Sequence, residues 1–311
     1  MINRKIKPLE GIIVPLVTPL CGNNRIDIDG LSNLVEHVVR GGVHGIFILG
    51  TTGEAQSLSM SQREEMIKET SRIVENRLPL LVGISDTSLS DSVALAQKAY
   101  EAGAYAVVAT PPYYFATAQS ELIGYFENLI SLLPLPLFLY NMPVHTKVAF
   151  DPKTIKQIAQ NEKVIGFKDS SANGTYLQTV MYIMRERPEF MIFVGPEEMT
   201  AEMVLMGAHG GVNGGANLFP ELYVELYGAA KSHNIEKVRR LQQKVMQISS
   251  GIYSKGKYGS SYLLGLKCAL SVAGICSDFP AMPFTRFDEE YRNKIEQEMV
   301  KIENLLHTGK M

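Results

Sequence analysis

A short apolar run recurs eight times in the first 218 residues of this chain, and this repeat limits its fold more than any other feature. Each run is rich in β-branched and apolar residues and precedes a longer stretch with helical periodicity. Starts about 20 to 35 residues apart fit one strand, one helix and two loops. Eight such units predict a parallel sheet closed into a (β/α)₈ TIM barrel. The runs are GIIVPLVTP (11–19), GIFILGTTG (45–53), LPLLVGIS (78–85), YAVVATPP (105–112), LPLFLYNMP (135–143), VIGFKDSS (164–171), FMIFVGPE (190–197) and GGVNGGANL (210–218).

A doubly wound open sheet would show the same alternation of strands and helices. That fold would also place a Gly-rich dinucleotide turn after its first strand, where this chain reads TPLCGNN (18–24). Three of the intervening stretches carry Ser or Asp near their start, as helix N-termini do. We therefore expect the barrel.

The strand-like runs stop after residue 220, and four helical stretches follow, at about 221–232, 235–251, 259–274 and 288–307. The first of these would be the eighth barrel helix. No Pro/Gly/Ser-rich linker separates the others from it. We therefore expect a catalytic barrel over residues 1–232 and a C-terminal helical extension, packed on the barrel, over residues 233–311.

Composition argues against several classes of partner. The net charge is −2 and no run of like charge stands out, which does not suggest binding to nucleic acid or an anionic membrane. Cys21, Cys268 and Cys276 are too few and too scattered for a disulfide framework. The basic N-terminal stretch has no apolar segment after it, and no apolar run is long enough to span a bilayer. We expect a cytoplasmic protein with a small-molecule partner.

Lys168 is the first candidate for chemistry. The active sites of (β/α)₈ barrels lie at the C-terminal ends of the strands. The sixth run places Lys168 directly after an apolar string, where its amine could enter the barrel mouth between apolar walls. A desolvated amine is a nucleophile for carbonyl carbon. On this run alone, a lysine that pairs with Asp169 or extends to solvent would also fit.

Tyr140 ends the fifth run, one βα unit before Lys168. Adjacent parallel strands are about 4.8 Å apart, so the two side chains could meet over one cavity. A tyrosine there can carry protons during imine formation and retro-aldol cleavage. A lone tyrosine at a strand end is usually packing, so the pairing with Lys168 carries this prediction.

The second run ends in GTTGE (50–54), where Gly50 and Gly53 flank Thr51 and Thr52. Glycines allow successive backbone N–H groups to converge, and with two hydroxyls they form a neutral site suited to a carboxylate. Such a site would hold the carboxylate of a 2-oxo acid while its carbonyl faces Lys168. A tight turn followed by a helix cap would give the same pattern.

Other motifs are less specific. Tyr113 and Tyr114 in TPPYY lie at another strand end, as lid packing or as a proton relay. The glycines of GGVNGGAN (210–217) could hold a phosphate or only permit close backbone approach. The six histidines are dispersed, and no HxxxH, HExxH, GxSxG or Walker pattern occurs. We predict no metal and no cofactor.

Taken together, GTTGE, TPPYY, YNMP, GFKDSS and GAHGGVNGGAN, in this order and at these spacings, resemble one family. It includes dihydrodipicolinate synthase, N-acetylneuraminate lyase and the 2-keto-3-deoxy sugar-acid aldolases. The resemblance covers nearly the whole chain. It implies a (β/α)₈ barrel with a C-terminal helical extension, a homo-oligomer (tetramer or dimer) and a metal-free class I mechanism through a lysine imine.

The resemblance also implies roles for single residues, carried over by position. The reacting groups would be the Schiff-base lysine Lys168, the proton donor Tyr140, and the hydroxyl relay of Thr51 and Tyr114. Thr52 and Val212 match positions that hold pyruvate, beside Gly50 and Gly53. Specificity for the second substrate would depend on loop side chains such as His145, Ser171 and Asn213.

His145 is a departure from the synthase pattern. Dihydrodipicolinate synthases place an arginine two residues after the proline of YNxP, where it binds the carboxylate of aspartate semialdehyde; this chain reads YNMPVHTK (140–147). An imidazole cannot form the bidentate fork of a guanidinium. GFKDSS also resembles the sugar-acid aldolases more than the GIKEA(T/S)G of the synthases, while GTTGE differs from the usual GSTGE of the N-acetylneuraminate lyases. His145 could equally be loop surface.

We therefore expect a lyase that cleaves a 2-keto-3-deoxy sugar acid or an N-acetylneuraminate-like substrate to pyruvate and an aldehyde, or that runs in reverse. Three alternatives remain. One is a dehydratase acting on a 2-keto-3-deoxy acid through the same imine. Another is a 4-hydroxy-tetrahydrodipicolinate (dihydrodipicolinate) synthase, which condenses pyruvate with aspartate semialdehyde. The last is a non-catalytic 2-oxo-acid-binding protein.

Overall fold

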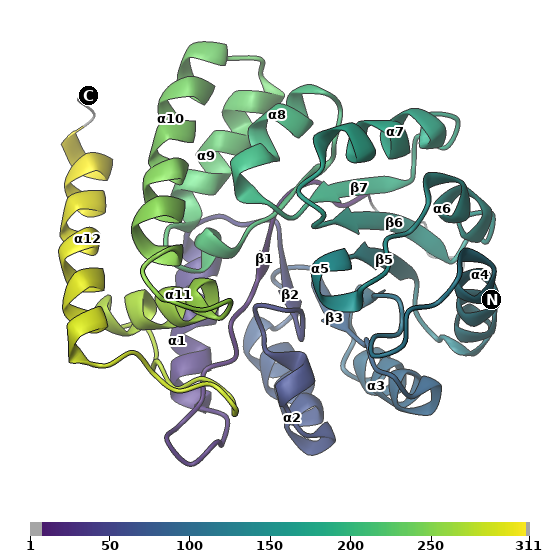
Figure 1. Ribbon diagram of the computed structural model, residues 1–311, viewed down its shortest axis with the longest axis horizontal. Coiled ribbons are helices and arrows are strands. Elements are labelled where there is room, and N and C mark those ends of the chain that lie inside the picture. Colours follow the sequence, from purple (N-terminus) through teal and green to yellow (C-terminus); the bar gives the residue numbers. More distant parts are fainter. Residues whose placement is uncertain (1–7, 309–311) are drawn as a thin grey trace.

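The computed structural model describes residues 8–308 and forms a closed barrel of eight parallel strands in chain order (Figure 1). This confirms the predicted barrel. The strands are β1 (Gly11–Pro15), β2 (Gly45–Ile48), β3 (Leu80–Gly83), β4 (Ala106–Ala109), β5 (Leu137–Asn141), β6 (Val164–Asp169), β7 (Met191–Val194) and β8 (Gly210–Val212).

Helices follow the strands and surround the barrel (Figure 1). Those between β1 and β8 are α1 (Ile28–Arg40), α2 (Met60–Val74), α3 (Leu89–Glu101), α4 (Gln119–Leu132), α5 (Pro143–Thr146), α6 (Pro152–Ile158), α7 (Gly174–Met184) and α8 (Thr200–Leu205). Single turns η1 (Ala55–Ser57), η2 (Glu197–Met199) and η3 (Gly214–Asn217) follow β2, β7 and β8. Asp27, Ser59, Ser88 and Asn173 accept a backbone hydrogen bond as N-caps of α1, α2, α3 and α7.

The barrel closes where β1 pairs with β8, with Gly11 opposite Gly210. The two backbones approach closely there, because a Cβ on Gly210 would lie 1.8 Å from the carbonyl oxygen of Gly11. Any side chain larger than hydrogen at residue 210 would force these strands apart. The strands are buried along their whole length, as expected for a parallel sheet covered by helices.

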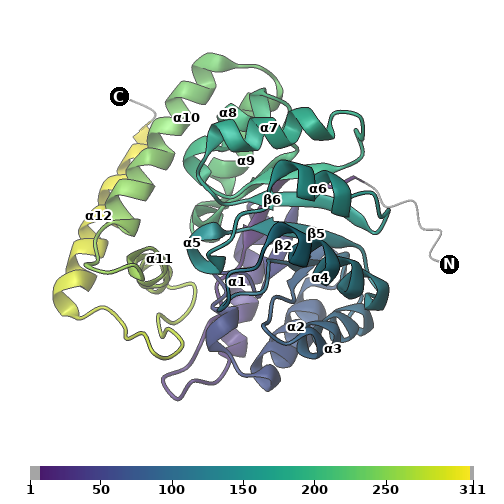
Figure 2. The ribbon, with the colours of Figure 1, turned by 45° about the vertical axis from the view of Figure 1, so that its right-hand side comes forward.

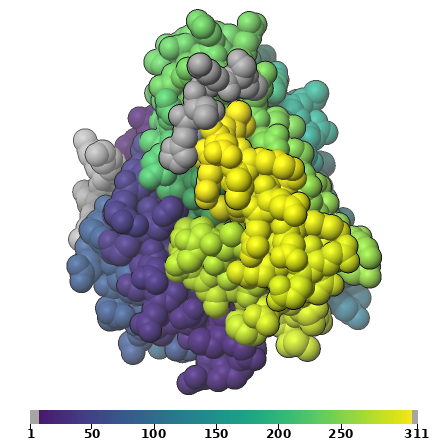
Figure 3. All heavy atoms as spheres, turned by 90° about the vertical axis from the view of Figure 1, so that its left-hand side faces the viewer, coloured from purple at the N-terminus to yellow at the C-terminus, as the bar shows by residue number. Residues whose placement is uncertain are grey.

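The C-terminal segment comprises α9 (Pro220–Lys231), α10 (Ile235–Ile248), the π-helical turn η4 (Ser249–Tyr253), α11 (Ser261–Val272) and α12 (Glu289–Thr308). Figures 1 and 2 show α10, α11 and α12 together on one side of the barrel, with α12 alongside α10. In Figure 3 the yellow C-terminal segment lies directly against the purple N-terminal part of the chain. None of the helices described combines the length and hydropathy needed to cross a lipid bilayer.

A buried ion pair joins this extension to the barrel. Lys267 of α11 is fully buried and donates to the carboxylate of Glu54, which follows β2 and is 4% exposed. The same ammonium donates to the Phe279 carbonyl at 2.7 Å, and the Ala281 amide donates to Glu54 at 2.7 Å. Burial lowers the pKa of Lys267, and the Glu54 carboxylate acts against this. We propose that residues 233–311 are an extension of the barrel and not an independently folding domain.

We predict that Lys267→Met lowers the free energy of unfolding by about 3–5 kcal/mol, because Glu54 would keep a buried charge without its cation. In the double variant Glu54→Gln/Lys267→Met no charge remains, so most of the loss should be recovered. Urea denaturation of the three proteins measures this. Equal destabilisation in the single and double variants would contradict the ion-pair argument.

Candidate active site

Lys168 lies opposite Tyr140 in the register between β5 and β6, and its side chain enters the barrel. It is only 7% exposed. Its Nζ atom lies 3.8 Å from the ring centroid of Tyr140 and 5.2 Å from that of Phe47. The next residue, Asp169, instead accepts hydrogen bonds from the Asn141 amide and the Ser171 hydroxyl, each at 2.8 Å. The lysine is therefore available to the barrel interior.

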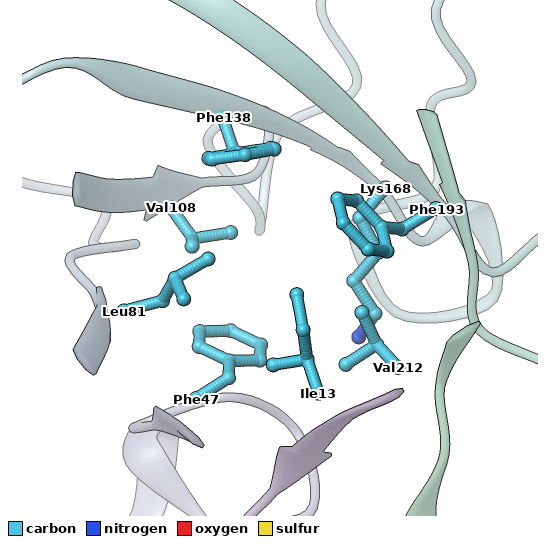
Figure 4. Close-up of a pocket in the computed structure, with 8 residues that line it drawn as sticks. All are labelled: Ile13, Phe47, Leu81, Val108, Phe138, Lys168, Phe193 and Val212. Atoms are coloured by element: carbon cyan, nitrogen blue, oxygen red, sulfur yellow. The ribbon is translucent and has the colours of Figure 1, made fainter. Parts of the chain in front are cut away.

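The seven residues that line the cavity together with Lys168 are apolar (Figure 4). Every strand contributes one inward side chain to it: Ile13, Phe47, Leu81, Val108, Phe138, Lys168, Phe193 and Val212. An unprotonated amine in such a cavity is a nucleophile for a carbonyl carbon.

Tyr140 is the second polar group at this level, and it is 4% exposed. Its hydroxyl is hydrogen-bonded to the Thr51 hydroxyl at 3.2 Å. Burial alone would raise the pKa of Tyr140, but the Lys168 charge and polar contacts with Thr51, Lys168 and Ser170 bring it below its ordinary value. A phenol in this state can both release and accept a proton.

The GTTGE turn lies beside this pair and is shaped by close packing. Added Cβ atoms would lie 2.7 Å from the Phe47 ring at Gly50 and 3.1 Å from the Leu16 carbonyl at Gly53. Thr52 is 6% exposed, and its hydroxyl pairs with that of Tyr262 of α11 at 3.2 Å. Thr51 therefore faces Tyr140, whereas Thr52 is held by the C-terminal extension.

Val212 and Asn213, the residues predicted for the site at the end of the eighth strand, lie in different surroundings. Val212 lines the Lys168 cavity. Asn213, the next residue, is fully buried, and its amide donates to the Thr200 hydroxyl at 2.8 Å and to the Gly195 carbonyl at 3.4 Å. The structure does not bring Asn213 into the cavity.

Tyr114 and His145 lie outside the buried site. Tyr114 has a φ of 95° and is 74% exposed, with its ring edge-on to that of Phe115 at 5.1 Å. His145 is exposed on the short helix α5, where partial desolvation lowers the pKa of its imidazole. Within one chain neither joins the Lys168 and Tyr140 pair, so their roles in the reaction stay predictions.

The glycines of GGVNGGAN serve close packing. The Cβ positions of Gly214 and Gly215 are filled by the hydroxyls of Tyr262 and Tyr223, at 1.8 and 2.0 Å. These contacts fit the interpretation of this motif as one of close approach. Over residues 8–308 no cluster of three or more His, Cys, Asp or Glu could hold a metal ion.

Tyr262 and Glu197 also lie at or near the site, although no motif in the sequence marks them. Tyr262 contacts Thr52 across 210 residues of chain, from helix α11 of the C-terminal extension. Glu197 is buried in the turn that follows β7, where the two glutamates of PEE (196–198) were the available signal. Polar groups at strand ends in a barrel should be read as site candidates even when their partners are unknown.

Comparison with known proteins gives the family. A model of the dihydrodipicolinate synthetase family matches residues 8–302. Among curated proteins, a probable 2-dehydro-3-deoxy-D-pentonate aldolase of Escherichia coli is 29% identical over 93% of this chain and 96% of its own.

Solved structures agree with this assignment. A dihydrodipicolinate synthase from Bacteroides thetaiotaomicron is 62% identical, with a TM-score of 0.93 over 94% of this chain and 99% of that one. A prophage protein of the dihydrodipicolinic acid synthase family from Escherichia coli, in complex with pyruvate, is 26% identical, with a TM-score of 0.90 over 94% and 98%. This chain therefore belongs to the dihydrodipicolinate synthetase family and is an enzyme, a lyase or synthase of the class I aldolase type.

Proposed function

We propose that Lys168 forms a Schiff base with pyruvate or a related 2-oxo acid, and that the enzyme cleaves a 2-keto-3-deoxy sugar acid or a similar substrate to pyruvate and an aldehyde. The observation that carries this proposal is the buried Lys168 amine, 3.8 Å from the ring centroid of Tyr140, whose hydroxyl is paired with Thr51. An amine, a phenol and a hydroxyl in contact provide a nucleophile and a proton relay.

The reaction follows from these groups. The Lys168 amine adds to the C2 carbonyl, and the carbinolamine loses water to give an iminium ion. Tyr140 supplies the proton to the departing hydroxyl. It then removes the proton from the C4 hydroxyl of the substrate, so that the C3–C4 bond breaks into an aldehyde and an enamine. Protonation of the enamine at C3 and hydrolysis release pyruvate, while Thr51 exchanges protons with Tyr140.

The substrate carboxylate needs neutral donors at a fixed distance from Lys168. The turn of Gly50, Thr51, Thr52 and Gly53 offers hydroxyl and backbone N–H groups, and Val212 lines the cavity beside Lys168. Donors arranged in this way bind a carboxylate without a neighbouring cation. We assign the 2-oxo acid half of the substrate to this turn.

A second candidate is the synthase reaction with aspartate semialdehyde, favoured by the 62% identity to the Bacteroides thetaiotaomicron synthase structure. His145 argues against it, because an imidazole with a lowered pKa is neutral at physiological pH and offers no fork for a carboxylate. A dehydratase that uses the same imine without breaking the C3–C4 bond is a further alternative.

We expect pyruvate plus cyanoborohydride to add one reduced pyruvate to the peptide that contains Lys168, as found by mass spectrometry. Lys168→Arg should abolish this addition, because the guanidinium cannot form an imine. Lys267, buried and paired with Glu54, is the internal control and should stay unmodified. Protein without an adduct at Lys168 would contradict the proposed function.

The substrate class is tested by a side-by-side assay. We expect cleavage of 2-keto-3-deoxygluconate or N-acetylneuraminate to have a higher kcat/KM than condensation of pyruvate with aspartate semialdehyde. His145→Arg should raise kcat/KM for the condensation roughly 10-fold, through a charge-assisted bond to the semialdehyde carboxylate. His145→Gln, which adds no charge, is the matched control. Faster condensation than cleavage by the wild type would favour the synthase.

We also propose that the enzyme is a homo-oligomer, a dimer or tetramer. Tyr114, Phe115 and Val144 follow the adjacent strands β4 and β5, and they are 74%, 77% and 77% exposed. Large apolar side chains grouped on a surface are typical of contacts between proteins.

We expect light scattering after size exclusion to give a multiple of the 34.4 kDa chain mass for the wild type and a smaller mass for Phe115→Ser. Tyr182→Ser, which changes a 66% exposed residue of α7, should leave the mass unaltered. A monomeric wild type would exclude this proposal.

A further inference from the structure

A buried carboxylate outside the Lys168 cavity connects the proposed substrate-binding segments. Glu197 begins η2 after β7 and is 4% exposed. It accepts three hydrogen bonds: from the Gly215 amide at 2.8 Å, from the Tyr223 hydroxyl at 2.5 Å and from the Tyr253 hydroxyl at 2.8 Å. With three donors pointing at it, the carboxylate serves as an acceptor for the protein and not as a free group.

One arm of this network leads to the eighth strand. Gly215 lies three residues after Val212, which lines the Lys168 cavity. The Glu197 carboxylate and the Tyr223 hydroxyl fill the space beside Gly215, since a Cβ there would lie 2.8 and 2.0 Å from their oxygens. The turn after β8 is therefore fixed by Glu197.

The other arm leads to the GTTGE turn. The ring of Tyr253 packs edge-on against that of Tyr262, with centroids 4.7 Å apart. Tyr262 in turn pairs with the Thr52 hydroxyl at 3.2 Å. The position of Thr52 thus depends on an aromatic pair that Glu197 holds at one end through Tyr253.

We infer that Glu197 is a positioning residue that fixes Thr52 and the turn after Val212 around the 2-oxo acid, through tyrosines of the C-terminal extension. This inference rests on the proposed function, because the groups it positions are those assigned to the substrate carboxylate and its cavity. Glu197 itself does not line the cavity. Its role is to set the distance between two binding segments from different strands, β2 and β8.

The charge of Glu197 decides whether the network is complete. Burial raises the pKa of the Glu197 carboxyl to about 7, and the neighbouring Glu198 adds to the rise. The hydrogen bonds from Tyr223, Gly215 and Tyr253 act in the opposite direction. The groups that face it are Tyr223 of α9, Tyr253 of η4, Tyr262 of α11 and Glu198. When ionised, Glu197 accepts hydrogen bonds from all three donors. When protonated, it carries its own proton where one of these donors already points.

The test is the pyruvate concentration that gives half the maximal rate of cyanoborohydride trapping at Lys168. At pH 8 we expect this concentration to rise roughly 10-fold in Glu197→Gln and in Tyr262→Phe, since misplaced binding groups weaken binding by such factors. The rate at saturating pyruvate should stay within about twofold, because Lys168 and Tyr140 are unchanged. The double variant should show no further loss, because both changes break one network.

The pH dependence separates positioning from loss of packing. In the wild type the half-saturating concentration should fall as pH rises through about 7, where Glu197 ionises, and Glu197→Gln should lack this change. Glu202→Gln, an exposed glutamate of α8, should behave as the wild type. Circular dichroism confirms that each variant is folded.

The outcomes distinguish the two proposals. A wild type that is not trapped at Lys168 contradicts the proposed function. A wild type that is trapped, together with a Glu197→Gln variant of equal half-saturation and equal pH dependence, overturns the inference about Glu197 alone. Additive losses in the double variant would do the same.

Discussion

Eight inward side chains, one from each strand, line the cavity inside the barrel, and seven of them are apolar. Closure of the barrel turns alternate residues of every strand inward, because side chains along a strand alternate with a period of two. Lys168 is the eighth, so its amine is surrounded by rings and branched side chains, with the phenol of Tyr140 in the paired position of β5. The proposed chemistry depends on this amine and phenol among apolar side chains.

Most of the fold and the Lys168–Tyr140 pair could be predicted from the sequence, because both depend on short-range patterns. Apolar runs followed by helical stretches predict the strands, and neighbouring parallel strands bring equivalent ends together. The roles of Tyr253 and Tyr262 could not be predicted in this way. The Thr52 contact with Tyr262 joins residues 210 apart, and no local pattern marks a tyrosine in an amphipathic helix as part of a site.

Asn213 shows a second limit of predicting site residues from the sequence. The register of β1 and β8 places Val212 opposite Ile13, and both line the cavity. Strict alternation then turns the next residue outward, where Asn213 contacts Thr200, the first residue of α8. Once Val212 is assigned to the inside of the barrel, alternation along the strand places the Asn213 side chain outside it. The prediction for Asn213 used its position in the motif and not the direction of its side chain.

Different residues hold the two halves of the proposed substrate site in place. The 2-oxo acid half depends on Glu197 and on tyrosines of the extension. The segment that carries His145 is anchored at one end by Asn141, whose amide donates to Asp169 at 2.8 Å and whose oxygen accepts the Phe150 amide at 3.1 Å. We therefore expect substitutions between Asn141 and Phe150 to leave Thr52 and Lys168 in place. Under the proposed function, such a barrel would keep its imine chemistry while its second substrate varies, in line with relatives of similar fold that are named synthases and aldolases.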